Sequence, residues 1–341
     1  MDAPRRSLSA GRAASTVRRT EEGRTRDRAA PEFPVTFLVG AERSGTTLLR
    51  LMLDGHPRLA FRYEFELAVD LVPDGEGWPE LETYYEHLRT MRWVDPPPHV
   101  DRALDYPSLV RSFLEQKRSA DRKPLVGATV HRHYDRLLRI WPDARFVHLV
   151  RDGRDVARST VAIGWAGNVW TACEHWAAAE RLWAQVAATL PADRRIDVHY
   201  EELVRDPRAT LERICAFIGI EYDEAMLEYP QRSSYRAPDP ALAERWRETF
   251  APHELRLVES RIGELLVERG YPLSGAPLAP PSLPLRAALA VHCRAGRAQH
   301  AARSLGVRLW LERLLAHRVG PRWWREAVQL RIHEVVNAQL A

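Results

Sequence analysis

The stretch around which this chain is organised begins Val35-Thr36-Phe37-Leu38-Val39-Gly40-Ala41-Glu42-Arg43-Ser44-Gly45-Thr46-Thr47-Leu48-Leu49-Arg50 and continues to His56. Its β-branched and apolar start predicts a buried strand, and the apolar spacing from Leu48 to Leu53 predicts a helix. The glycines between them have the spacing of a phosphate-binding loop, but Thr46 stands where a nucleoside triphosphatase has lysine. Loop N–H groups and the helix N-terminus would still bind an anion. The sequence therefore predicts an anion site without the lysine that a triphosphate needs.

Charge is concentrated at the two ends of the 341-residue chain, which is 45% hydrophobic and 28% charged. Residues 1–30 hold eight arginines and four acids, and residues 285–341 hold ten arginines and three glutamates. The ends thus carry +4 and +7, and because the whole chain carries +4, the part between them carries −7. We therefore expect no nucleic-acid partner for the central part.

The chain is long enough for one α/β domain of roughly 250 residues with extensions at both ends. Residues 1–31 hold almost nothing to bury, so we expect a disordered basic segment. The folded domain is expected at 32–273, followed by a proline-rich linker at 274–284. Residues 285–341 have a basic, helical pattern. They could contact a membrane surface or a partner subunit, including a second copy in a homodimer, or pack on the domain with their arginines in solvent.

The three cysteines, Cys173, Cys215 and Cys293, are widely spaced and show neither a disulfide framework nor a metal-binding pattern. This favours a reducing compartment. The N-terminus has no apolar core of a signal peptide, and no run approaches 18 apolar residues. We therefore expect a cytoplasmic protein without a bound metal.

Strand-like runs alternate with helical patterns along the central part of the chain. They lie near residues 59–61, 124–128, 145–150 and 196–200. The alternation predicts an α/β fold, a P-loop-like three-layer domain with a central parallel sheet, in which ligands bind at the carboxyl ends of the strands. The loop after residue 39 and the segment after residue 150 both occupy such ends.

Two other segments have distinct patterns. Residues 73–108 are rich in proline, tryptophan and charge without a regular period, and we expect a substrate-facing insertion there. Residues 168–190 carry tryptophans at helical steps. We interpret that helix as part of the core and not as a cofactor site.

A basic segment, Arg151-Asp152-Gly153-Arg154-Asp155, follows the strand at 145–150 directly. Ser159 comes two helical turns later. An arginine at a strand end and a hydroxyl on the next helix can share one anion, and the arginine fork suits a phosphate because it donates two hydrogen bonds at once. By itself this segment would also fit an ion-paired turn.

Together, the segments at 40–49 and 146–154 resemble the sulfotransferase family that uses 3′-phosphoadenosine 5′-phosphosulfate (PAPS). The first resembles the 5′-phosphosulfate loop and the second the 3′-phosphate motif, and the resemblance covers about Phe33 to Tyr271. It implies PAPS as co-substrate, transfer of a sulfuryl group to a hydroxyl or amine, and no metal. The absent lysine agrees with a nucleotide that has no γ-phosphate.

Within that family, the arrangement from Arg43 through His56-Pro57 to a later glutamate is most similar to tyrosylprotein sulfotransferases and their bacterial relatives. The resemblance implies that Glu64, 21 positions after Arg43, is the catalytic base. Arg43 would also stabilise the phosphosulfate. Other implied nucleotide contacts are Ser44, Gly45, Thr46 and Thr47 at the 5′ end, Arg151 and Ser159 at the 3′-phosphate, Tyr200, and Arg245 near the end of a nucleotide-covering loop at 231–236.

The chain departs from the family at one motif. Many relatives have Gly-x-Lys-Thr-Pro, whose lysine contacts the transferring group, but this chain reads Gly127-Ala128-Thr129-Val130-His131 and has no lysine near Ala128. Arg132 or Arg43 could replace it. Because a histidine base is also chemically competent, His131, expected at a helix start, is an alternative to Glu64. Glu66 is a further rival.

Two other functions stay open at this point. The chain could be a nucleotide-binding pseudoenzyme or a membrane-associated scaffold that has lost transfer activity. A P-loop nucleotide kinase is disfavoured because the loop lacks lysine. The sequence does not distinguish a small-molecule, carbohydrate, lipid or peptide acceptor.

Overall fold

The computed structural model describes residues 34–340 except 94, 95 and 279, so the segment at 1–31 lies outside the described residues. One parallel sheet has the strand order β2-β3-β1-β4-β5. The strands are β1 (Thr36–Val39), β2 (Leu59–Arg62), β3 (Leu125–Val130), β4 (Arg145–Val150) and β5 (Arg195–His199). The predicted α/β fold with a central parallel sheet is confirmed.

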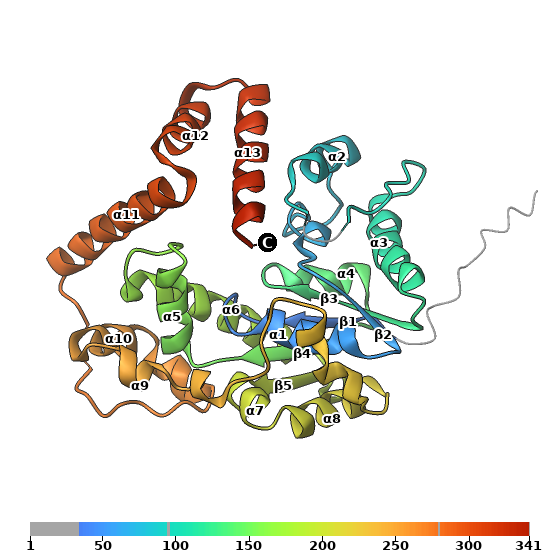
Figure 1. Ribbon diagram of the computed structural model, residues 1–341, viewed down its shortest axis with the longest axis horizontal. Coiled ribbons are helices and arrows are strands. Elements are labelled where there is room, and N and C mark those ends of the chain that lie inside the picture. Colours follow the sequence, from blue (N-terminus) through green and yellow to red (C-terminus); the bar gives the residue numbers. More distant parts are fainter. Residues whose placement is uncertain (1–33, 94–95, 279, 341) are drawn as a thin grey trace, which may run out of the picture. The chain divides into compact units, whose positions relative to one another are not determined.

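Helices cover both faces of the sheet (Figure 1). The helices in the described part of the chain are α1 (Thr46–Gly55), α2 (Leu81–Thr90), α3 (Tyr106–Ala120), α4 (Leu137–Ile140), α5 (Gly153–Ala162), α6 (Val169–Thr189), α7 (Tyr200–Arg205), α8 (Pro207–Ile218), α9 (Trp246–Thr249), α10 (Pro252–Glu268), α11 (Leu283–Leu305), α12 (Val307–Val319) and α13 (Arg322–Leu340). Short 3-10 turns, such as Glu66–Ala68, lie between them.

The sheet separates two large apolar clusters, which makes the domain three-layered. Phe37 and Val39 of β1 pack with α2, α3 and α4 on one face, whereas Leu38 packs with α1, α7 and α8 on the other. All four residues of β1 are buried. A strand buried on both faces has a continuous apolar sequence, which explains the run from Val35 to Val39.

Helix boundaries follow local capping chemistry. Asp152 accepts a hydrogen bond from the Arg154 N–H and begins α5. Asp206 begins α8 with Pro207 at its first position, as expected, and Gly219 ends it in the left-handed conformation. On α6, Trp176 and Trp183 are fully buried, which confirms the core interpretation of its tryptophan seam.

Two local predictions were wrong, and the segment at 73–108 is more regular than its sequence pattern indicated. It contains the helix α2, which buries Tyr84 and Leu88. The flanking prolines obscured this short helical period. His131 does not begin a helix but follows β3 directly. The expected linker at 274–284 is shorter, since α11 begins at Leu283; Pro284 fits there because the first turn of a helix needs no proline N–H.

The C-terminal basic extension is helical, as predicted, and consists of α11, α12 and α13 (Figure 1). Helix α11 is fixed to the start of α6, where the Asn168 side chain donates a hydrogen bond of 2.8 Å to the Leu289 carbonyl. Helices α12 and α13 share a small core of Ala316, Val328 and Ile332. No helix in the described part of the chain is long and apolar enough to cross a membrane.

Candidate active site

The loop between β1 and α1 needs its two glycines for different steric reasons. A Cβ on Gly40 would lie 2.3 Å from the Leu149 carbonyl oxygen, and one on Gly45 would lie 2.4 Å from the Tyr200 ring. Both residues have φ in the positive region. No side chain caps α1 at Gly45, so the first N–H groups of this helix remain available to an anion.

The loop meets the second predicted phosphate-binding segment through Arg43. The Arg43 Nε donates a hydrogen bond of 3.0 Å to the Ser159 Oγ on α5, across 116 residues of sequence. Arg43 has a φ of 72°, an uncommon conformation for a residue with a side chain and one that is typical of functional sites. The structure thus brings together two residues that the sequence assigned to opposite ends of one nucleotide.

Arg151 lies at the carboxyl end of β4 and is held from several sides. Its Nη2 donates to the Leu242 carbonyl at 2.9 Å, and its guanidinium lies 4.2 Å from the centre of the Tyr200 ring. The Asp155 carboxylate is 3.8 Å away. Burial raises the pKa of Asp155 to about 6, although Arg151 opposes this shift. The cation is therefore positioned before any ligand binds.

The buried polar atoms of this region that have no hydrogen-bond partner among the described residues include the Ser44 Oγ and the Arg151 Nε. Buried polar groups are normally satisfied, so such atoms point to a ligand or to water. Both lie at the predicted anion site, and they fit a phosphorylated nucleotide.

Tyr200 and Arg245 differ in how well they fit their predicted roles. Tyr200 begins α7 immediately after β5 and is buried against Gly45 and beneath Arg151. Arg245 is exposed at the start of α9, and none of its described contacts connects it to the loop. The next residue, Trp246, is tied to the site because its N–H donates a hydrogen bond of 2.7 Å to Asp155. The roles of both residues remain predictions.

Glu64 lies in a short segment that runs along the end of β3. The Phe65 N–H donates to the Thr129 carbonyl at 2.8 Å, and the Glu66 carboxylate accepts from the His131 N–H at 2.9 Å. These two bonds fix the two residues that directly follow Glu64 against the end of β3. Its side chain is 42% exposed, and its Oε2 lies 3.9 Å from the Arg92 Nη2.

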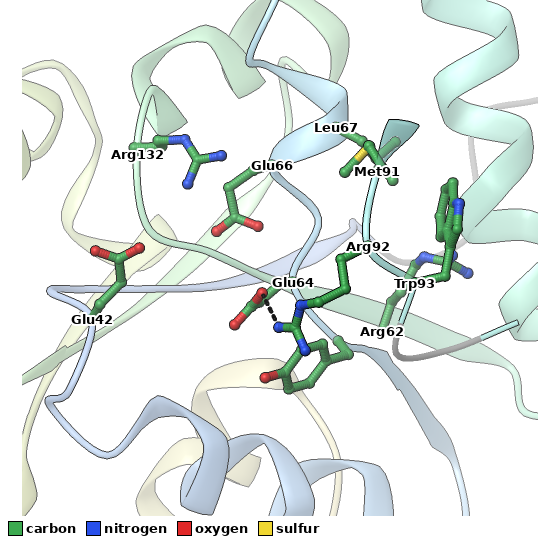
Figure 2. A pocket seen from close by; sticks show the side chains of 10 residues that line it. Glu42, Arg62, Glu64, Glu66, Leu67, Met91, Arg92, Trp93 and Arg132 are labelled. Atoms are coloured by element: carbon green, nitrogen blue, oxygen red, sulfur yellow. Dashed lines mark ion pairs between the residues drawn. The ribbon is translucent and has the colours of Figure 1, made fainter. Parts of the chain in front are cut away.

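A cavity of about 170 Å³ opens beside this segment. Figure 2 shows the carboxylates of Glu42, Glu64 and Glu66 around it, together with the guanidinium groups of Arg92 and Arg132. Arg132 makes two hydrogen bonds to Asp70, of 2.8 and 2.7 Å. The Arg132 guanidinium is therefore already hydrogen-bonded to Asp70, which argues against Arg132 as a direct replacement for the family lysine.

A smaller hollow connects the loop with the catalytic candidates. Its lining residues are Thr46, Thr47, Arg50, Tyr63, Glu64, Thr129 and His131. Glu64, the predicted base, thus lines the same hollow as Thr46 and Thr47, which are predicted to bind the 5′-phosphate. Burial, followed by the Glu64 carboxylate, raises the pKa of Tyr63 to about 12, so this phenol stays protonated beside Glu64.

The rivals of Glu64 are also present. Glu66 is buried, and burial raises the pKa of its carboxyl group even though His131 opposes the shift. The His131 Nδ1 lies 3.2 Å from the Gly40 carbonyl oxygen. Because a carbonyl only accepts, that nitrogen carries the proton, and a neutral His131 keeps a lone pair on Nε2.

In the motif Gly-x-Lys-Thr-Pro, the position of the missing lysine is occupied by Thr129, the neighbour of Ala128. Successive residues of a strand point to opposite faces. Ala128 is fully buried and belongs to the cluster with Phe37, whereas Thr129 lines the smaller hollow. The Thr129 Oγ1 is a further buried atom without a hydrogen-bond partner among the described residues.

Sequence reasoning missed Arg92 and Asp155. Arg92 follows α2 within the irregular region, and no sequence pattern connects it with Glu64. Asp155 belongs to the Arg151 segment, but its contact with Trp246, a residue 91 positions away, could not be read from the sequence. In both cases the contact that matters is long-range.

Comparison with known proteins decides the family. Residues 34–224, more than half of the chain, match the family model described as Sulfotransferase family. The chain belongs to this family. The resemblance inferred from the loop and the Arg151 segment is therefore confirmed.

Individual relatives in this family share only about a quarter of the aligned residues with this chain. Protein-tyrosine sulfotransferase 2 of Gallus gallus is 25% identical over 220 residues, which are 60% of this chain and 56% of the relative. Protein-tyrosine sulfotransferase 1 of Danio rerio is 27% identical over 212 residues, 59% of this chain and 57% of the relative. The match thus spans little more than half of each relative.

Among solved structures, the sulfotransferase domain of the Synechococcus PCC 7002 olefin synthase is 24% identical to this chain. The alignment covers 67% of this chain and 94% of that domain, with a TM-score of 0.46.

Proposed function

We propose that the protein transfers a sulfuryl group from PAPS to an acceptor hydroxyl or amine. The observation that carries this proposal is the meeting of three groups at one edge of the sheet. These are the glycine loop with its free helix N-terminus, the Arg43–Ser159 pair, and Glu64 on the wall shared with Thr46 and Thr47.

Nucleotide binding is supported by the buried Ser44 Oγ and Arg151 Nε, which have no hydrogen-bond partner among the described residues. The loop N–H groups, the Ser44 hydroxyl and the α1 N-terminus would hold the 5′-phosphosulfate, since together they offer hydrogen-bond donors and a positive partial charge. Arg151 and Ser159 would hold the 3′-phosphate. The Arg151 Nε is free to donate, and the Arg43–Ser159 bond would link the two phosphate-binding groups.

The chemistry then follows from the positions of the side chains. The acceptor oxygen or nitrogen forms a bond to sulfur as the bond from sulfur to the 5′-phosphate oxygen breaks, and the nucleotide leaves as adenosine 3′,5′-bisphosphate (PAP). Glu64 takes the acceptor proton, because its carboxylate is accessible and lies at the hollow beside the loop. Arg43 and the loop amides offset the charge that develops on the leaving phosphate.

The acceptor would enter through the cavity beside Glu64. Relatives of the chain are named protein-tyrosine sulfotransferases. A peptide with a tyrosine hydroxyl is therefore the first acceptor to test, followed by small phenols, carbohydrates and lipids.

A nucleotide-binding pseudoenzyme is the second candidate. The observation that favours it is Thr129, an uncharged residue at the position where many relatives have a lysine on the transferring group. In that case the protein would bind PAP but transfer nothing.

The decisive experiment combines nucleotide binding with 35S transfer from labelled PAPS to the acceptors named above. The variants are Glu64→Gln and Arg151→Ala, with the exposed Glu76→Gln as a matched control. We expect Glu64→Gln to bind PAP normally and to lose transfer by about 100-fold or more, because the proton acceptor is gone. Arg151→Ala should weaken PAP binding by about 10- to 100-fold, through the loss of a charged hydrogen-bond donor.

Other results would redirect the proposal. PAP binding without transfer to any acceptor would favour the pseudoenzyme. Normal transfer by Glu64→Gln, with loss in His131→Gln, would assign the base to His131. Binding of ATP but not PAP would contradict the sulfotransferase function.

A further inference from the structure

One face of α12 is apolar and has no partner in the described part of the chain. Val307, Leu311, Leu314 and Leu315 follow one another at helical spacing, and 60%, 46%, 42% and 53% of these residues' surfaces are exposed. The opposite face of the helix, with Ala316, is buried against α13. Helix α12 therefore has one apolar side that packs on α13 and a second apolar side that is exposed to solvent.

The exposed apolar surface continues beyond α12. Val319 at its end is 78% exposed and Trp323 at the start of α13 is 70% exposed. Ten of the sixteen large apolar side chains that are exposed in the described residues belong to residues 283–330. Such a concentration is unusual for surface residues of a folded domain and marks an interaction site.

Positive charge accompanies this apolar face along the same helix. Arg308, Arg313 and Arg318 are all exposed on α12. Residues 285–341 as a whole carry ten arginines against three glutamates. The partner must therefore offer both an apolar interior and negative charge at its surface.

We propose that α12 and the α12–α13 turn dock on an anionic lipid membrane, with the apolar face in the interface and the arginines at the headgroups. A membrane surface supplies both required properties, and Trp and Leu with flanking arginines are typical of interfacial helices. A second copy of the chain fits less well, because it would bring two extensions of charge +7 together. Nucleic acid would match the charge but not the exposed leucines.

The extension is joined to the rest of the fold, so docking would involve the whole protein. Helix α11 is bonded to α6 through Asn168, and the Arg322 side chain of α13 pairs with Glu86 on α2. This inference is independent of the proposed function, because it does not require any chemistry at the loop.

The test is flotation of the full chain with vesicles of phosphatidylcholine alone, or with phosphatidylglycerol added, at low and high salt. We expect binding to the anionic vesicles to be at least about tenfold stronger than to the neutral ones, and to weaken with salt. The double variant Leu311→Ser/Leu315→Ser should lose at least about tenfold in binding. The exposed Leu278→Ser, outside the extension, is the matched control.

PAP binding and thermal unfolding of each variant show whether the fold is intact. Equal binding to neutral and anionic vesicles, or none to either, would overturn the proposal. So would a dimer in solution that the double variant dissociates, since this would assign the face to a second copy.

Discussion

At the scale of single residues, the loop is determined by steric conditions that few side chains can meet. Gly45 has a φ of 96° and faces the Tyr200 ring, which in turn supports Arg151. Gly45 therefore lets the N-terminus of α1 lie directly against the Tyr200 ring that supports Arg151. The glycine is visible in the sequence, but only the fold shows that a side chain at this position would collide with the Tyr200 ring.

Gly45→Ala tests this connection. The added methyl group would collide with the Tyr200 ring and force an unfavourable φ, so the unfolding free energy should fall by about 1–3 kcal/mol. PAP binding should weaken as the loop amides shift. Chemical denaturation measures the unfolding free energy, and calorimetric titration measures the affinity for PAP. Gly75→Ala, where an added Cβ meets nothing within 4 Å, is the control and should change stability by less than about 0.5 kcal/mol. Unchanged PAP affinity in Gly45→Ala would contradict the assignment of the loop.

At the scale of elements, an ionic cluster around the buried His148 and Glu180 joins β4, α6, β5 and the end of α10. His148 on β4 lies 2.8 Å from the Asp197 carboxylate and 3.4 Å from the Glu180 carboxylate. Glu180 also accepts a bond of 2.6 Å from Arg269. Burial disfavours the charged imidazole, but the two carboxylates outweigh it and raise the pKa of His148.

This cluster predicts a pH-dependent stability. A raised pKa in the folded state means that the contribution of His148 is fully present below its unfolded pKa of about 6.5 and is lost as the pH rises through the folded value. The unfolding free energy of the wild type should therefore fall above about pH 6.5 more steeply than that of His148→Gln. His253→Gln, on the exposed side of α10, is the control. A difference between wild type and His148→Gln that grows with pH would show that the sign is wrong.

At the scale of the whole molecule, the C-terminal extension reaches the residues around the proposed base. The Arg92 Nη1 donates a bond of 3.3 Å to the Asn337 Oδ1 on α13, while its Nη2 lies 3.9 Å from Glu64. Arg92 and Glu64 both line the cavity in Figure 2. The final helix and the cavity beside Glu64 are therefore connected through one arginine.

Asn337→Ala should loosen this connection. We expect hydrogen exchange of the segment from α2 to Trp93 to rise by about 2- to 10-fold, the effect of one lost hydrogen bond. PAP affinity should not change, because the polar contacts of α13 in the described residues go to Arg92, Glu86 and the extension itself. Glu334→Gln, exposed on the same helix, is the control. Equal exchange in both variants would mean that α13 does not restrain Arg92.

The sequence by itself determined the parallel sheet and the family, and it singled out the loop after β1 and the Arg151 segment. Each of these depends on short-range patterns: apolar runs, glycine spacing and an arginine directly after a strand. Tertiary structure alone decided which of these groups meet. It placed Arg43 on Ser159, put Thr129 at the wall of the hollow beside the loop, and brought Arg92 to Glu64. The physical reason is that a local pattern fixes which face a residue is on, whereas the packing of distant elements fixes what lies opposite that face.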